Sequence, residues 1–320
     1  MDLLGGHGLG AWALFNLLIL VLLAIDLGVL NRKAHVVGFR EALVWNVVWV
    51  AVALAFWGFV HWLYGAQSGL EYLTGYVIER ALSVDNIFVF VVLFRYFAVP
   101  AEYQRRVLYW GILGALLMRG GLILTGAALV AVFHWVLYLF GAFLVWSGVQ
   151  LLFASDEPVD PERNVLVRMA VRWFPVTPLL HGPRFLVRLA DGWHATPLLL
   201  VLLVVETTDL MFAFDSIPAI FAVTRDPFIM YTSNVFAILG LRAMYFLLAA
   251  LLPQFRFLRH GLSAVLVLVG ARMLAEPWIE MPTAVTLLIV CGILAIAVAA
   301  SMLVRPRGKG EDEERTGVPD

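Results

Sequence analysis

The sequence predicts an all-α, polytopic transmembrane protein, a bundle of about nine helices. Of the 320 residues, 62% are apolar and 14% are charged, and the mean hydropathy is +0.91. A soluble domain is about 45–50% apolar and about 25% charged. The apolar residues also gather in long runs, and a helix needs a run of roughly 20 such residues to cross a bilayer. Together these observations exclude a soluble globular domain.

Nine segments have the length and composition of a membrane span. They are residues 10–30, 42–64, 76–97, 106–130, 133–153, 197–223, 230–252, 258–276 and 282–304. No charged residue separates the fourth segment from the fifth, and we place the turn between them at His134 and Trp135. The first segment has neither a basic stretch before it nor a small-residue cleavage site after it. We therefore expect a retained helix rather than a signal peptide.

The basic residues predict how the spans are oriented. Most of the 22 Lys and Arg lie in alternate connections, whereas the opposite set of connections contains a single basic residue, Arg225. Four more arginines lie inside the spans: Arg80, Arg119, Arg242 and Arg272. Because cytoplasmic loops are enriched in Lys and Arg, this pattern predicts an external N-terminus and a cytoplasmic C-terminus in the inner (plasma) membrane. An eight-span count would break the alternation.

The chain divides into one large domain and a tail. Residues 1–304 form the predicted transmembrane domain, which includes a cytoplasmic loop at 154–196. A basic amphipathic stretch within that loop, residues 163–173, is expected on the inner leaflet, whose anionic lipids attract Lys and Arg. Residues 305–320 are charged and poor in apolar side chains, so we expect a disordered cytoplasmic tail. The chain has one cysteine, Cys291, and so cannot form an intramolecular disulfide.

Spans 3–5 and spans 6–8 resemble each other. The matched stretches are Asp85-Asn-Ile-Phe-Val-Phe90 with Asp209-Leu-Met-Phe-Ala-Phe214, Ile112-Leu-Gly114 with Ile238-Leu-Gly240, and Gly148-Val-Gln-Leu-Leu152 with Gly270-Ala-Arg-Met-Leu274. Their offsets of 124, 126 and 122 residues are nearly constant. An offset of three spans reverses the direction across the membrane, so this pattern predicts an inverted repeat. Transporters built in this way bind their substrate near the midplane, where the repeats meet.

Two acidic stretches lie inside apolar segments. The first contains Glu79, Asp85 and Asn86, and the second contains Glu206, Asp209, Asp215 and Ser216. Ionisable groups at membrane depth are costly and therefore indicate function. Pro218 removes a backbone N–H, so we expect the second stretch to bend or unwind at residues 215–218 and to free carbonyl oxygens beside the carboxylates. We predict that the two stretches face each other around a cation.

Structural ion pairing is the alternative explanation for these acids. Several charged residues qualify as ion-pair or gating residues: Glu79, Arg80, Arg119, Arg242 and Asp26. We expect a mixture, in which Glu79 or Glu206 holds an arginine while the three aspartates bind the cargo. Asp26 is interpreted first as an interface residue beside Arg32 and Lys33. The triplet Thr232-Ser233-Asn234 is interpreted first as a helix cap at the start of the seventh span.

The ligand types limit the cargo to hard cations. Residues 76–97 and 197–223 contain no His and no Cys, so the candidate ligands are carboxylate, amide and hydroxyl oxygens. Such sites suit Mn²⁺, Mg²⁺ or Ca²⁺ better than Zn²⁺ or Cu⁺. No set of a nucleophile and a base indicates an enzyme. The expected partners are a divalent cation, the lipid bilayer and other proteins of a membrane complex, with no nucleic acid and no prosthetic group.

Five stretches carry a resemblance to a known family: residues 75–90, 106–115, 137–144, 206–222 and 228–242. In them the sequence resembles the TerC family of bacterial integral membrane proteins. The family takes its name from tellurium-resistance operons, is associated with manganese homeostasis, chiefly export, and is placed near the LysE group of exporters. The resemblance implies that the metal-handling positions are Asp85, Asn86, Glu206, Asp209, Asp215 and Ser216.

The sequence and the resemblance lead us to expect a Mn²⁺ exporter that works by alternating access. Three alternatives stay open. The cargo could be Ca²⁺, or it could be a tellurium oxyanion, which the acids disfavour unless the arginines line the path. The protein could also be a non-transporting scaffold or stress component of a membrane complex.

Overall fold

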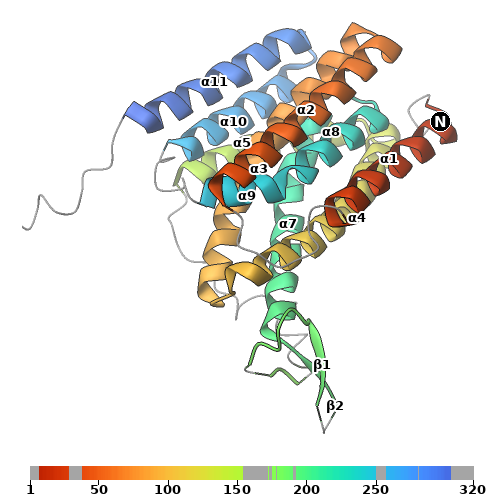
Figure 1. The fold of residues 1–320 in the computed structure, drawn as a ribbon. Helices are drawn as coiled ribbons and strands as arrows, with labels where there is room; N and C mark the ends of the chain where they lie inside the picture. Colours follow the sequence, from red (N-terminus) through yellow and green to blue (C-terminus); the bar gives the residue numbers. More distant parts are fainter. Residues whose placement is uncertain are drawn as a thin grey trace, which may run out of the picture.

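A computed structural model describes residues 7–28, 38–153, 172, 175–177, 179–189, 192–249, 257–279 and 281–303 (Figure 1). The helices are α1 (Leu9–Gly28), α2 (Phe39–Tyr64), α3 (Ala66–Tyr96), α4 (Ala101–Val132), α5 (Val136–Phe153), α7 (Pro197–Phe221), α8 (Pro227–Leu239), α9 (Leu241–Ala249), α10 (Leu258–Ala275) and α11 (Thr283–Leu303). Two short strands, β1 (Leu186–Leu189) and β2 (Gly192–Ala195), form an antiparallel hairpin. The predicted all-α membrane fold is confirmed.

Each of the nine predicted segments coincides with one helix or, for residues 230–252, with the pair α8 and α9. Seven of the described helices are long and apolar enough to cross a bilayer, or eight if α8 and α9 form one span that is bent by 41°. The remaining candidate is α3, which is 31 residues long but carries five charged side chains: Glu71, Glu79, Arg80, Asp85 and Arg95. The count of nine spans and the orientation of the termini stay predictions.

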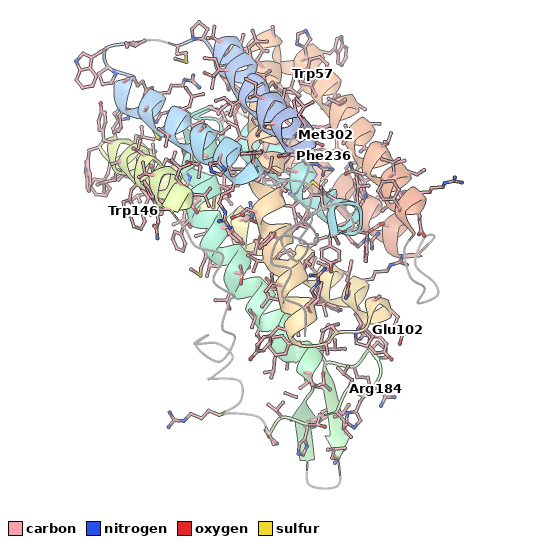
Figure 2. All side chains as sticks on the ribbon, turned by 90° about the vertical axis from the view of Figure 1, so that its left-hand side faces the viewer. Trp57, Glu102, Trp146, Arg184, Phe236 and Met302 are labelled. Atoms are coloured by element: carbon pink, nitrogen blue, oxygen red, sulfur yellow. The ribbon has the colours of Figure 1, made fainter. Side chains whose placement is uncertain are left out.

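The outside of the bundle is apolar, as a lipid-facing surface must be. Trp62 at the end of α2 is 80% exposed, Leu288 on α11 is 72% exposed and Trp146 on α5 is 59% exposed. Trp146 and Met302, labelled in Figure 2, are exposed, whereas Phe236 of α8 is buried. Large exposed apolar surfaces are rare on soluble monomers. The chain is therefore a multi-pass integral membrane protein.

The predicted break at residues 215–218 is wrong. α7 runs as a continuous α-helix to Phe221 with Pro218 inside it. Pro218 lies in the last turn, so the helix loses only the hydrogen bond to the carbonyl of Phe214 and then ends. The break lies instead at Gly240, between α8 and α9. A Cβ at Gly240 would overlap the Arg80 guanidinium, so a glycine is needed for that approach.

The predicted helix cap at Thr232-Ser233-Asn234 is also wrong. α8 begins at Pro227, and the carboxylate of Asp226 caps it by accepting hydrogen bonds from the amides of Phe228 at 2.9 Å and Ile229 at 3.4 Å. An Asp at the N-cap followed by a Pro at the first helical position is a stronger start signal than the later triplet. All three residues of the triplet are buried inside α8.

The helices of the predicted repeat pack with an approximate exchange symmetry. α3 packs on α8 as α7 packs on α4, and α5 packs closely along α10. The Gly141 carbonyl lies against Gly270, and the Ser263 hydroxyl donates a hydrogen bond to the Gly148 carbonyl. Residues 141 and 263 are 122 apart, and so are residues 148 and 270, so exchanging the two halves turns the first contact into the second. These contacts have the symmetry that the inverted repeat requires, although the repeat itself stays a prediction.

The long loop contributes a feature that the sequence pattern did not predict. The β1–β2 hairpin pairs Leu186 with Ala195 and Leu189 with Gly192, and it extends beyond the first turn of α7 (Figures 1 and 2). Apart from Arg172, the amphipathic stretch predicted at 163–173 lies outside the described residues, as does the tail predicted at 305–320.

Candidate functional site

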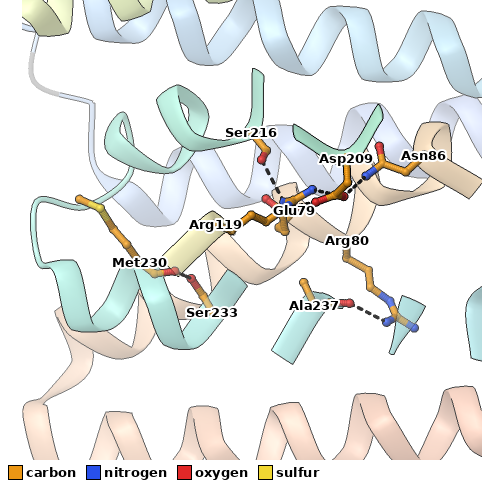
Figure 3. A network of polar contacts seen from close by, with 9 residues as sticks. All are labelled: Glu79, Arg80, Asn86, Arg119, Asp209, Ser216, Met230, Ser233 and Ala237. Carbon is orange, nitrogen blue, oxygen red and sulfur yellow. Dashed lines mark hydrogen bonds and ion pairs between the residues drawn. The ribbon is translucent and has the colours of Figure 1, made fainter. Parts of the chain in front are cut away.

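A buried arginine holds the two acidic stretches together. Arg119 of α4 is 2% exposed, and its guanidinium donates to Asp209 of α7 through Nε at 3.1 Å and Nη2 at 3.0 Å. Its Nη1 donates to the Glu79 carboxylate of α3 and to the Ser216 hydroxyl at 3.0 Å (Figure 3). The Asn86 side-chain amide donates to Asp209 at 3.4 Å. We call Glu79, Asn86, Arg119, Asp209 and Ser216 the arginine cluster.

Helical spacing explains why these residues meet. Glu79 and Asn86 are seven residues apart on α3, and Asp209 and Ser216 are seven residues apart on α7. Seven residues are about two turns, so each pair lies on one helix face. α4 then brings Arg119 between the two faces. The bidentate geometry is that of the strongest carboxylate pairs, but two carboxylates against one guanidinium leave the cluster with one net negative charge.

Beside the arginine cluster lies a central cavity of about 240 Å³. Helices α3, α4, α5, α7 and α10 surround it, and its lining residues are Glu79, Leu82, Asp85, Asn86, Arg119, Ser147, Gln150, Leu151, Phe212, Asp215, Ser216, Leu262 and Leu266. One water molecule needs about 10–15 Å³ of such space. The cavity therefore has room for a small ion together with several waters.

Asp85 and Asp215 are the carboxylates that this cavity brings together outside the arginine cluster. Asp215 accepts a hydrogen bond from the Ser147 hydroxyl at 2.7 Å. The charges of Arg259 and Asp215 both act on Asp85. Both aspartates are half-buried, which leaves their oxygens accessible from the cavity.

The six predicted metal-handling residues therefore fall in three places. Asp85, Asn86, Asp215 and Ser216 line the cavity, and Asp209 is bound by Arg119. Glu206 does not line the cavity; its carboxylate lies against Gly114 of α4, where a Cβ would overlap it. Within the described part of the chain, no group of three His, Cys, Asp or Glu side chains is placed to hold a metal ion. A cation in the cavity would depend on two carboxylates and on neutral oxygens.

Ser147 and Gln150 of α5 supply neutral oxygens that sequence reasoning missed. They are three residues apart, which puts them on the same face of the helix. The available signal was weak, because a serine or a glutamine in an apolar span is common and carries no charge. Only the packing of α5 beside α7 shows that Ser147 reaches Asp215.

The remaining ion-pair and gating candidates lie away from the cavity. Arg242 of α9 forms an ion pair with Asp26 of α1, whereas Arg32 and Lys33, the predicted neighbours of Asp26, lie outside the described residues. Arg80 donates to the Asn46 side chain and, at 3.4 Å, to the Ala237 carbonyl beside the α8–α9 break. Structural pairing is therefore the better description of these three charged residues.

Comparisons with known proteins bear on this arrangement. Residues 64–309 match the family described as the integral membrane protein TerC family. The chain is 50% identical over 294 residues to an uncharacterised membrane protein of Myxococcus xanthus, STKORF319, with 92% of each chain covered. It is 44% identical over 316 residues to a protein of Escherichia coli O157:H7 named as a proposed membrane-bound redox modulator, Alx, with 96% of this chain and 97% of that one covered. No solved structure matches the chain.

Proposed function

Since this chain belongs to the TerC family of integral membrane proteins, we propose that it exports divalent metal cations, Mn²⁺ above all, across the inner (plasma) membrane. The observation that carries the proposal is that Asp85 and Asp215, from two helices far apart in the sequence, line one cavity inside the bundle. The direction of transport and the preference for Mn²⁺ follow from the family resemblance and belong to the proposal.

The chemistry of the cavity suits a hard divalent cation. Two carboxylates balance the charge of one such ion, and Asn86, Ser147 and Gln150 add amide and hydroxyl oxygens. Carboxylate and carbonyl oxygens with water are the ligands that Mg²⁺, Ca²⁺ and Mn²⁺ prefer. The cargo would keep some of its waters, because two carboxylates cannot fill the coordination sphere of these ions.

The arginine cluster has a different role in this proposal. By pairing with both Glu79 and Asp209, Arg119 joins α3, α4 and α7 into one unit around the cavity. The cargo is then attracted by Asp85 and Asp215 rather than by all of the acids. We propose proton antiport as the driving force, since carboxylates release protons when a metal binds and regain them when it leaves. No covalent step is required.

Two other functions compete with this one. A Ca²⁺ transporter would use the same oxygens. A non-transporting scaffold or stress component would keep the arginine cluster for stability alone. An oxyanion cargo such as a tellurium oxyanion is disfavoured, because three carboxylates line the cavity and its one guanidinium, that of Arg119, already binds Glu79 and Asp209. The redox activity in the name of the Escherichia coli relative is a property of that protein; this chain has a single cysteine, Cys291.

The proposal is tested by reconstituting the purified protein in liposomes and following Mn²⁺ flux with an entrapped dye. Asp85→Asn and Asp215→Asn should each reduce the flux by about tenfold or more, because loss of a ligand costs at least as much as loss of a supporting residue. The matched control is Glu102→Gln, which removes an acid at the exposed start of α4 (Figure 2).

Each outcome of this experiment decides something. If the wild-type protein shows no flux of Mn²⁺, Ca²⁺ or Mg²⁺, transport is rejected in favour of the scaffold. If the wild type transports and both aspartate variants match Glu102→Gln, the cavity is not the site. Competition among the three cations then identifies the preferred cargo.

A further inference from the structure

A second pocket, of about 750 Å³, lies at one end of three helices that also line the central cavity: α3, α7 and α10. It is formed by the start of α3, the connection from α7 to α8, the end of α10 and the start of α11. Its charged residues have both signs: Glu71, Arg225, Asp226, Arg272 and Glu276. Arg225 and Glu276 pair at 2.7 Å, and the Arg272 guanidinium donates to the Met281 carbonyl at 3.1 Å.

The two pockets lie one behind the other along three shared helices. In α3 the cavity is lined within residues 79–86 and the second pocket within residues 67–71. The corresponding ranges are 212–216 and 222–226 at the end of α7, and 262–266 and 272–276 at the end of α10. The gaps are six to eight residues. At about 1.5 Å of rise per residue, they correspond to roughly 9–12 Å.

An apolar layer fills this separation. Ile78 of α3, Ala219 of α7 and Val269 of α10 occupy the gaps, and their exposures are 2%, 0% and 0%. All three belong to one hydrophobic cluster, which also contains Leu266 at the cavity and Val223 at the second pocket. The cluster thus reaches from one pocket to the other, and the sequence between the two linings, residues 72–78, 217–221 and 267–271, has no charged side chain. We call Ile78, Ala219 and Val269 the barrier layer.

We propose that the second pocket is the other end of the cation path and that the barrier layer is its closed gate. Hydrophobic constrictions stop ions by excluding the water that an ion carries with it. The barrier layer separates the carboxylates of the cavity from a polar pocket. The second pocket has three carboxylates and two arginines, and Arg225 pairs with Glu276, so it offers hydration to a released ion while part of its negative charge is already balanced.

The predicted topology assigns this gate a side of the membrane. The start of α3, the ends of α7 and α10 and the start of α11 all belong to connections that the positive-inside pattern places outside. Their convergence on one pocket agrees with that pattern. The second pocket is then the external exit, and alternating access requires the three helices to separate at the barrier layer. This inference rests on the proposed function.

The test measures whether the barrier layer opens during transport. In a Cys291→Ser background, Ala219→Cys places a thiol in the layer, and Val290→Cys is the matched control. Val290 is also 0% exposed and belongs to the same cluster, but α11 contributes no residue to the cavity. A membrane-impermeant thiol reagent is applied to the reconstituted protein with and without Mn²⁺.

We expect Mn²⁺ to raise the modification rate of Ala219→Cys by about tenfold or more, since a minor open state is typically populated at about 0.1–10% before a ligand favours it. Val290→Cys should stay unmodified. Adding Val269→Ser to Ala219→Cys should raise the rate without Mn²⁺, because a hydroxyl admits water into the layer, whereas Val290→Ser should not. Ile78→Cys gives the same readout where Ala219→Cys does not assemble.

The gate is rejected if Mn²⁺ flux is intact in the Cys291→Ser parent while the rates at positions 219 and 290 are equal with and without Mn²⁺. If the parent protein shows no flux, the proposed function fails instead. The two failures are therefore separate results of one preparation.

Discussion

Asp85 and Asp209 occupy matching positions in the two acidic stretches, yet they have different surroundings. Asp85 is half-buried at the central cavity beside Asp215. Asp209 is 3% exposed and accepts two hydrogen bonds from Arg119 and one from Asn86. The difference comes from α4, which places an arginine against α7. Position 245 of α9, which corresponds to Arg119 at the offset of 126, is a tyrosine that donates to Gln104.

In the proposed function, this difference gives the two matched stretches different roles. In the copy that contains Asp209, this carboxylate is paired with Arg119 and links α7 to α4. In the proposed function, the copy that contains Asp85 keeps a carboxylate at the cavity for a cation. A buried charge without a partner is costly, so a membrane protein can leave few acids unpaired and must pair the rest. The following four predictions test this division, from the largest expected effect to the smallest.

Replacing Arg119 should have the largest effect on stability. Arg119→Gln leaves Glu79 and Asp209 buried without their cation, and breaking a buried pair in this way costs about 3–5 kcal/mol. Thermal unfolding in detergent, followed by tryptophan fluorescence, should show a marked decrease in Tm. Arg119→Lys keeps the charge without the bidentate geometry, so its Tm should lie between those of the wild type and Arg119→Gln. A Tm unchanged in Arg119→Gln would remove the structural role assigned to the arginine cluster.

Exchanging carboxylate for amide at the two matched aspartates should separate stability from binding. Asp209→Asn should lower the free energy of unfolding by about 1–3 kcal/mol, because Arg119 loses one of its charged partners. Asp85→Asn should leave Tm near the wild-type value and weaken Mn²⁺ binding by about tenfold or more. Calorimetric titration and thermal unfolding of both variants give the comparison. The proposed division fails if the two variants behave alike in both measurements.

Ser147 should act through Asp215. Ser147→Ala removes the hydroxyl that donates to the Asp215 carboxylate at 2.7 Å, and it should weaken Mn²⁺ binding by about tenfold, as loss of a group that orients a ligand does. Ser147→Thr keeps the hydroxyl and is the matched control. Equal affinity in Ser147→Ala and in the wild type would mean that the hydrogen bond does not position Asp215 for the cation.

Glu206 should have the smallest effect on binding. Its carboxylate lies against Gly114 and not in the cavity. Glu206→Gln should change the Mn²⁺ affinity by less than about threefold, because a charge that does not contact the ion acts only through a Coulomb energy that falls with distance. A loss as large as that of Asp85→Asn would show that Glu206 reaches the cation in another conformation.

The membrane fold follows from the sequence alone. Long apolar runs predict spans whatever their neighbours are, because hydrocarbon requires each helix to satisfy its own backbone groups. For the same reason, acids inside those runs stand out as functional candidates without any knowledge of packing. The family also follows from local motifs, and its model matches residues 64–309.

Only the tertiary structure decided which acid has which partner. Asp209 and Arg119 are 90 residues apart, and Ser147 and Asp215 are 68 apart, so no local pattern indicates either contact. The break at Gly240, where Arg80 of another helix approaches, likewise has no local signal, whereas Pro218, the local signal for a break, lies too near the end of α7 to cause one. A membrane span depends on the composition of one segment and on the lipid around it, whereas the site depends on contacts between helices that are far apart in the sequence.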